Sequence, residues 1–411
     1  MMLMNRRSAV MKSKFLIKIR AIDLISLIYI GTLCMPILDQ KINTNILVCL
    51  VGLLNIYFFS AISKNIYKKD LKYFFGMLIL VILSFVEGIL EGEFGIIFIY
   101  QILRQTVLVF MGTYYLWYAD NKRCRNIFLS VIIMLWITSI TSIFVLSTDE
   151  MASRIMATIG DSKNAYAVEM NLRNLGGFSI VYLCVAIIPL MVGLIKIQKK
   201  LSWIYIPFLL TILIYIYYAA YTTAMIISVI LLVITIFQGK TVKKSNYISI
   251  VLIFLVLYLL RYKIADGLYK IAESTANIVT NRLTYLADSI YGIKPDSDAQ
   301  LRIDYYARAW ETFLRHPLLG GVFSGDLKVS GHSVILDMIA KYGILGVGFL
   351  IGYYKSIKAF FYDKFYRNSM NFYILLSWIA CIILSGLNPV DNTLLLFVIL
   401  PTSLKWIDSR K

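Results

Sequence analysis

One segment of the chain, 301–346, contains two side chains suited to phosphate and proton chemistry. Arg302 carries a guanidinium group, which can bind phosphate oxygens through two parallel hydrogen bonds and stays charged at any pH. His332 carries an imidazole whose ordinary pKa is close to neutrality, so it can accept a proton from a hydroxyl group. The apolar spacing in 301–315 predicts an amphipathic helix, and Pro317 marks its end.

Each of these residues also has a plainer interpretation. An arginine on an external amphipathic helix often contacts lipid headgroups, and a histidine at the mouth of a membrane helix often makes only interfacial hydrogen bonds. Asp337 follows His332 by about one and a half helical turns. Asp337 either pairs with Lys341, four residues further on, or tunes the site around His332.

Another arginine lies inside an apolar segment, where a charge is costly. Arg104 falls about 12 Å below the outer end of a helix predicted over 96–118. A charge at this depth needs a partner or a wet cavity. Two compatible interpretations follow: an ion pair with Glu87, or a second contact to a phosphate group.

Four further residues are candidates for substrate binding. Arg173 and Arg154 lie in the external segment 147–174, and Arg173 is favoured because it directly precedes a membrane helix. Snorkelling to lipid headgroups is the alternative for both. Arg308 extends the basic surface near Arg302, and Trp310 either anchors the helix at the membrane interface or stacks on a sugar ring.

Metal and cofactor motifs are weak in this sequence. Asp296, Ser297 and Asp298 form a D-x-D motif, which holds a divalent metal in many nucleotide-sugar transferases. This motif directly precedes a helix, and an N-cap explains it adequately. Because no Cys/His metal spacing, Walker loop or dinucleotide fingerprint appears, we expect no metal and no cofactor.

The elements that must position these residues are membrane helices. Hydrophobic residues make up 59% of the 411 positions and charged residues only 16%, and the mean hydropathy is +0.75. A soluble chain of this length could not cover so much apolar surface. Apolar runs of about 17–25 residues suit helices that cross a bilayer and are too long for barrel strands. The predicted fold class is therefore all-α: a polytopic bundle of about twelve transmembrane helices.

The predicted transmembrane helices span 21–39, 43–61, 73–90, 96–118, 126–146, 175–195, 201–219, 222–237, 246–261, 333–354, 371–386 and 393–408. We interpret the first as a signal anchor, because basic residues precede it and no small-residue cleavage site follows. The seventh and eighth could also form one bent segment.

The net charge of +18 follows the membrane topology and gives no reason to expect nucleic acid as a partner. Lys and Arg gather in every second connection, so the positive-inside rule places both termini in the cytoplasm. The short external connections, at 40–42, 91–95, 220–221 and 387–392, hold only Lys41. On this topology 1–411 is one membrane domain. Its extracytoplasmic loops are 147–174 and 262–332, and the second, between helices nine and ten, contains short amphipathic helices.

The spacing within 301–346 resembles the O-antigen polymerase and ligase family of bacterial polysaccharide assembly. That family shows an arginine opening an amphipathic helix, then a tryptophan, a Pro-x-x-Gly turn, a His-Asn pair opening a membrane helix, and a Gly-h-h-Gly pattern. The matching residues are Arg302, Trp310, Pro317 with Gly320, His332, and Gly343 with Gly346. Ser333 stands where the family usually has Asn, and serine can still cap a helix.

The resemblance implies a metal-independent enzyme of the bacterial cytoplasmic membrane that transfers a glycan from undecaprenyl pyrophosphate to a hydroxyl group. It implies that Arg302 binds the pyrophosphate, that His332 is the base or orients the acceptor, and that an arginine of an earlier external loop assists. The favoured activity is polymerisation, with undecaprenyl pyrophosphate-linked oligosaccharide and membrane lipids as partners and other polysaccharide-assembly proteins as candidate partners. A ligase with another acceptor is the close alternative, and a flippase or transporter for lipid-linked oligosaccharide is the alternative from another class.

Overall fold

The computed structural model describes residues 20–63, 96–159, 164–237, 258–274, 278–293, 297–324, 327–365 and 370–408, together with residues 85, 252, 255 and 256. Every regular element in these ranges is a helix, which confirms the predicted all-α class. Almost all of the predicted helix 73–90, most of helix 246–261, and Glu87 lie outside the described residues.

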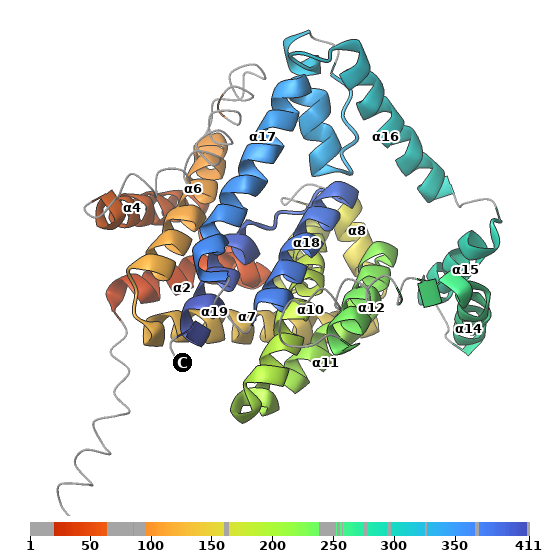
Figure 1. Cartoon of the computed structure of the whole chain (residues 1–411), viewed down its shortest axis with the longest axis horizontal. Helices are drawn as coiled ribbons and strands as arrows, with labels where there is room; N and C mark the ends of the chain where they lie inside the picture. The colour runs from red at the N-terminus through yellow and green to blue at the C-terminus, as the bar shows by residue number, and fades with distance from the viewer. Residues whose placement is uncertain are drawn as a thin grey trace, which may run out of the picture.

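Judged by length and composition alone, five described segments qualify as candidates to cross a membrane. Four of them are α4 (Thr44–Ser63), α7 (Asn121–Thr148), α10 (Phe178–Ile197) and α11 (Ser202–Ala219) with the turn before it, and the fifth is Val334–Gly352. Shorter apolar stretches lie in α2 (Ala21–Cys34), α6 (Ile96–Trp117), α12 (Thr222–Phe237), α18 (Asn371–Leu387) and the consecutive η3 (Leu395–Ile399) and α19 (Leu400–Asp408). The chain is thus a multi-pass membrane protein (Figure 1).

The seventh and eighth predicted helices are separate elements. Ala220 lies between α11 and α12 and has a left-handed backbone, with φ of 53°. A helix of L-residues cannot continue through this conformation. The chain therefore forms two helices here, with a break at Ala220.

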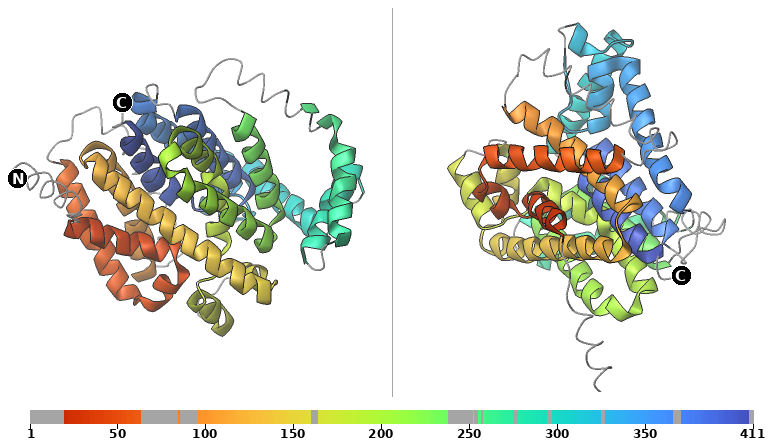
Figure 2. Two further views of the ribbon diagram at one scale, coloured as in Figure 1. Left: turned by 90° about the horizontal axis from the view of Figure 1, so that it is seen from below. Right: turned by 90° about the vertical axis from the view of Figure 1, so that its left-hand side faces the viewer.

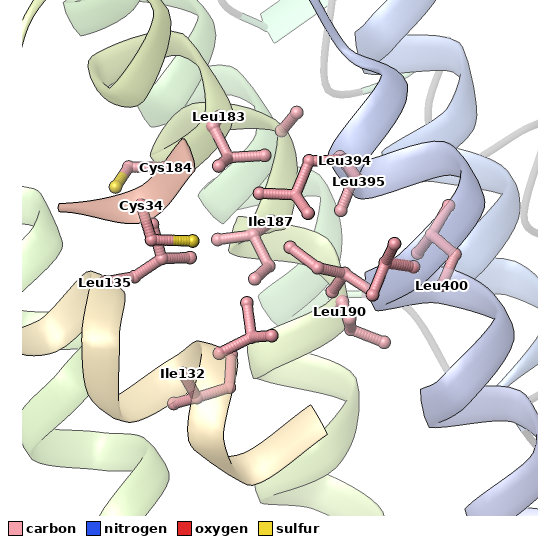
Figure 3. Packing of buried hydrophobic residues seen from close by; sticks show 14 of the residues in the cluster. Cys34, Ile132, Leu135, Leu183, Cys184, Ile187, Leu190, Leu394, Leu395 and Leu400 are labelled. Carbon is pink, nitrogen blue, oxygen red and sulfur yellow. The ribbon is translucent and has the colours of Figure 1, made fainter. Parts of the chain in front are cut away.

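Helix α10 forms the centre of the bundle. Its residues from Ile180 to Leu194 are all buried, and it packs against α11, α12 and α18. Figure 3 shows Ile187 of α10 among apolar side chains that include Ile132 of α7 and Leu395 of η3. A helix that is hydrophobic on every side needs neighbours on every side, and this explains the central place of α10.

A buried ion pair ties α2 to the beginning of α7. Arg123 donates from Nη2 and Nε to the two carboxylate oxygens of Asp23, at 2.6 and 2.9 Å. Both side chains are 8% exposed. The hydroxyl group of Tyr115 also donates to Asp23, at 2.8 Å, and that of Tyr114 accepts from Arg123 at 2.9 Å. These contacts satisfy both charges inside the protein.

The first predicted helix, 21–39, is wrong in one respect, because the structure divides it in two. Helix α2 ends at Cys34, Met35 is extended with φ of −128°, and α3 (Pro36–Lys41) begins with proline. Proline lacks an N–H group and disfavours a helical conformation in the residue before it. The helix therefore stops at Met35.

The described part of the predicted large loop, 262–332, contains three α-helices: α14 (Arg261–Ser274), α15 (Ile278–Tyr291) and α16 (Ser297–Arg315). Helices α14 and α15 pack against each other, and α16 packs on α17 (Val334–Phe365). Figures 1 and 2 place the α14–α15 pair beside the helical bundle, and Figure 1 shows α16 running from the side of that pair towards α17. The extracytoplasmic location of this segment stays a prediction.

Helix α17 reverses direction at Gly343, which corrects the predicted membrane helix 333–354. Gly343 has φ of 59° and ψ of −139°. A Cβ atom on Gly346 would lie 2.3 Å from the carbonyl oxygen of Met338, although eight residues of continuous helix span about 12 Å. The arm before Gly343 therefore folds against the arm after it. The first arm, 334–342, is too short to cross a hydrocarbon core of about 30 Å.

The Pro-x-x-Gly turn after α16 closes on this reversal. The carbonyl oxygen of Pro317 accepts a hydrogen bond from the N–H group of Ile344 at 2.7 Å. Gly320 has φ of 77°, and a Cβ atom there would lie 2.1 Å from the carbonyl oxygen of Lys341, so only glycine fits. The two glycine patterns of the sequence are thus one packed unit that joins α16 to α17.

Candidate functional site

A cavity of about 240 Å³ lies where both predicted external loops meet the helical bundle. Arg154 comes from α8 (Ala152–Ile159) in the first loop, and Arg282 and Arg302 come from α15 and α16 in the second. The lining consists of Arg154, Tyr182, Tyr221, Thr222, Thr223, Arg282, Tyr285, Leu286, Ser289 and Arg302. Tertiary packing thus gathers three guanidinium groups that are far apart in the sequence.

Among the described residues that line this cavity, none is an aspartate or a glutamate. The buried Nε atom of Arg154 has no hydrogen-bond partner among the described residues. The ion pairs within the described ranges include neither Arg154 nor Arg302. A concave surface lined by one sign of charge attracts the opposite sign, and the hydroxyl groups of the lining add hydrogen-bond donors. The cavity therefore suits an anion with several oxygen atoms, such as a diphosphate.

His332 lies beside this cavity and does not line it. Its imidazole centroid is 5.2 Å from the ring centroid of Tyr305, which lies about one turn after Arg302 on α16. No residue in the described part of the chain hydrogen-bonds to an imidazole nitrogen of His332. Arg302 therefore lines the cavity from a position close to His332.

The environment of His332 keeps its imidazole neutral near pH 7. Partial burial and the positive charge of Arg302 lower the pKa of His332 below its ordinary value, and the negative charge of Asp337 acts in the opposite direction. A neutral imidazole with unbonded nitrogens can accept a proton from a substrate hydroxyl group.

Ser333 caps α17, as the sequence predicts. Its hydroxyl oxygen accepts a hydrogen bond from the N–H group of Leu336 at 3.1 Å. Serine thus fulfils the local role of the asparagine that the resembling family usually has at this place.

Two predicted binding arginines lie away from the cavity. Arg173 forms an exposed ion pair with Glu169 at 2.6 Å, so the arginine favoured by the sequence is not the one of the first loop that lines the cavity. Arg104 pairs with Asp391 at 3.2 Å and lines a separate cavity of about 40 Å³. The partner of Arg104 among the described residues is therefore the acid of the last predicted external connection.

Arg308 and Trp310 lie on α16 without lining the cavity. The guanidinium group of Arg308 is 5.5 Å from the ring centroid of Tyr305. The Trp310 side chain is 47% exposed, and its ring centroid is 5.1 Å from that of Phe313. Their roles in substrate binding stay predictions.

Arg282 and the aromatic residues of the lining are not among the residues that the sequence predicts for a site. Arg282, Tyr285, Leu286 and Ser289 recur at spacings of three and four residues, which places them on one face of α15. The guanidinium group of Arg282 is 5.6 Å from the centroid of the Tyr285 ring. The periodic spacing was visible in the sequence, but nothing in it indicated what this face would meet.

The D-x-D motif lies at the boundary of the described residues. Asp296 is outside them, and α16 begins at Ser297. Within the described ranges, no group of three or more His, Cys, Asp or Glu side chains could hold a metal ion.

The fold and the cavity define a class: a multi-pass helical membrane protein with a cationic site built from two long loops. Residues 207–351 match the family model described as O-antigen ligase. This match confirms the resemblance to the O-antigen polymerase and ligase family over residues 207–351, and members of that family act on lipid-linked oligosaccharides in membranes. The matched range includes Arg302 and His332, but not Arg154. No curated protein matches the chain.

Proposed function

We propose that this protein polymerises glycan repeat units carried on undecaprenyl pyrophosphate, at the outer face of the bacterial cytoplasmic membrane. The product is capsular polysaccharide, exopolysaccharide or O-antigen. One observation carries the proposal: Arg154, Arg282 and Arg302 line a single cavity, and His332 lies beside it.

In this reaction a hydroxyl group of the acceptor glycan attacks the anomeric carbon of the donor. The bond between that carbon and the phosphate oxygen breaks, and its electron pair leaves with undecaprenyl pyrophosphate. Arg302 and Arg154 stabilise the charge that grows on the diphosphate. The neutral imidazole of His332 takes the proton of the attacking hydroxyl group, a step that typically contributes about 10²–10⁴-fold to the rate.

The size of the cavity suits the diphosphate end of the donor. Its volume of about 240 Å³ lies below the roughly 300–1,000 Å³ of pockets for drug-sized ligands. A diphosphate with the adjoining sugar fits this volume better than a whole oligosaccharide does. The rings of Tyr182, Tyr221 and Tyr285 line the same cavity and offer apolar faces to a sugar.

Purified lipid-linked repeat units test this proposal when they are supplied to the protein in proteoliposomes with no other acceptor. The wild-type protein is expected to produce a ladder of chain lengths, His332→Ala is expected to abolish it, and Arg302→Ala is expected to reduce it strongly. Glu311→Ala is a matched control, because Glu311 forms an exposed ion pair on the same helix as Arg302. Absence of a ladder from properly inserted wild-type protein would contradict polymerisation.

The description of the matched family favours a second candidate, transfer to a different acceptor in the manner of an O-antigen ligase. Arg302 and His332 serve both reactions, so the acceptor alone separates them. A ligase makes no ladder from repeat units alone and transfers them when a second glycolipid acceptor is added.

The transporter alternative is separated by where repeat units accumulate. In the enzyme, His332→Ala stops chain growth while repeat units still reach the outer face of the membrane. Accumulation of repeat units on the inner face of His332→Ala membranes would favour a flippase instead.

A further inference from the structure

We propose that Asp337 is the positioning residue for His332 and acts through Ser330 and Gly331. This inference rests on the proposed role of His332 as the base. Asp337 lies in the first turn of α17, and its carboxylate binds the loop that precedes the helix.

Three donors of that loop bind the carboxylate of Asp337. The N–H group and the hydroxyl group of Ser330 both donate to Oδ1 at 2.6 Å. The N–H group of Gly331 donates to Oδ2 at 3.0 Å. Hydrogen bonds to an ionised carboxylate are about twice as strong as neutral ones, so Asp337 holds this loop firmly onto the helix.

Ser330 transmits this restraint to the backbone of His332. Its side chain is buried, and its hydroxyl oxygen accepts hydrogen bonds from the N–H groups of His332 and Ser333, at 3.1 Å each. Gly331, between Ser330 and His332, has φ of 64°, which few side chains tolerate. The imidazole therefore takes its direction from a fixed backbone and from the neighbouring ring of Tyr305.

A simple helix cap would not explain this arrangement. Ser333 already caps α17 through the N–H group of Leu336. The donors that Asp337 binds belong to Ser330 and Gly331, which precede the helix. The carboxylate of Asp337 therefore organises the loop that contains Ser330, Gly331 and His332, in addition to any effect on helix stability.

Asp337 and Arg302 also act on His332 with opposite charges. Burial and Arg302 lower the pKa of His332, whereas Asp337 raises it. Asp337 comes from α17, and Arg302 comes from α16, which packs against it. Loss of Asp337 leaves the effect of Arg302 unopposed, so it has a spectroscopic consequence that a purely structural role does not predict.

Histidine NMR tests the proposal directly, because the chain has two histidines. In full-length protein labelled with ¹³C-histidine in lipid nanodiscs, His316→Gln assigns the two signals. We expect Asp337→Ala to displace or broaden the His332 signal and to lower its pKa further. Asp337→Asn, which keeps the shape of the side chain, is expected to shift the signal in the same direction. Glu311→Ala is expected to leave it unchanged.

Kinetics with lipid-linked repeat units complete the test. A misplaced catalytic group costs up to about 10²-fold, so Asp337→Ala is expected to lower kcat by roughly 10–100-fold. KM for the donor should change by less than about threefold, because Asp337 does not line the cavity.

A His332 signal and titration that match the wild type in Asp337→Ala would overturn the proposal, whatever the activity. If Asp337→Ala fails to fold, the His332 signal and its titration are measured in Asp337→Asn, and a match with the wild type overturns the proposal there too. A changed His332 signal, together with wild-type protein that transfers no glycan, would instead overturn the proposed function and leave the coupling between Asp337 and His332 standing.

Discussion

Two groups of arginines in this protein differ in how their charge is balanced. The charge of Arg123 is balanced inside the protein, since its guanidinium group binds both oxygens of Asp23 and the hydroxyl group of Tyr114. In the part of the chain that the structure describes, no carboxylate lines the cavity of Arg154 and Arg302. The first arrangement leaves no capacity for a ligand, whereas the second directs charged donors at a cavity.

On the proposed function, the first group of arginines stabilises the fold and the second binds substrate. A buried guanidinium with a carboxylate partner contributes to packing, and removal of either partner leaves an uncompensated charge. Like charges around one cavity repel each other, so they lower stability until an anion binds. Local rules of this kind are broken mainly at functional sites, and the cavity is where this chain breaks them.

Removal of Asp23 from its buried ion pair with Arg123 is expected to have the largest effect on stability. Asp23→Ala leaves the buried charge of Arg123 without a partner, which typically costs about 3–5 kcal/mol. Thermal unfolding of the purified protein measures this loss. The double variant Asp23→Leu with Arg123→Met should recover much of it. A melting temperature of Asp23→Ala equal to that of the wild type would show that the pair of Asp23 and Arg123 does not stabilise the fold.

Removal of a cavity arginine is expected to reduce activity without loss of stability. Arg302→Ala deletes a donor aimed at the developing charge, and losses of about 10²–10³-fold in kcat are typical of such donors. The glycan-ladder assay measures the rate, and thermal unfolding should show an unchanged or higher melting temperature. A drop in melting temperature as large as that of Asp23→Ala would show that Arg302 is a structural residue.

The two arginines of the first loop are expected to differ from each other. On the proposed function, Arg154→Ala removes a charged hydrogen bond to the substrate, worth about 1.5–3 kcal/mol, and should slow transfer at least about tenfold. Arg173→Ala removes an exposed pair with Glu169, worth about 0.3–0.5 kcal/mol, and should leave the rate near that of the wild type. A larger loss of rate in Arg173→Ala than in Arg154→Ala would show that Arg173 is the arginine of this loop that serves the reaction.

The smallest expected effect is a shift of the pH profile. Since the pKa of His332 is lowered, the acidic limb of kcat/KM should lie at a lower pH than an ordinary histidine would give. Arg302→Gln removes a positive charge that opposes protonation, so it should move the acidic limb to higher pH. The pH dependence of the residual rate of this variant measures the shift. An acidic limb at the same pH as in the wild type would show that the charge of Arg302 does not affect His332.

The sequence by itself determined the class of the protein and most of its helices. Apolar runs must form helices in lipid, because no other open structure satisfies the backbone there. The predicted helices 43–61 and 201–219 accordingly coincide with α4 and α11 to within two residues. The cap by Ser333 was also predictable, because it depends on residues three positions apart.

Only the tertiary structure decided which charged residues share a site. Arg154, Arg282 and Arg302 lie on different helices, and periodicity identifies the face of a helix without identifying its neighbour. The reversal at Gly343 likewise depends on the turn at Pro317, which donates no hydrogen bond but accepts one from Ile344. Contacts between distant segments follow from packing, and a local pattern contains no information about them.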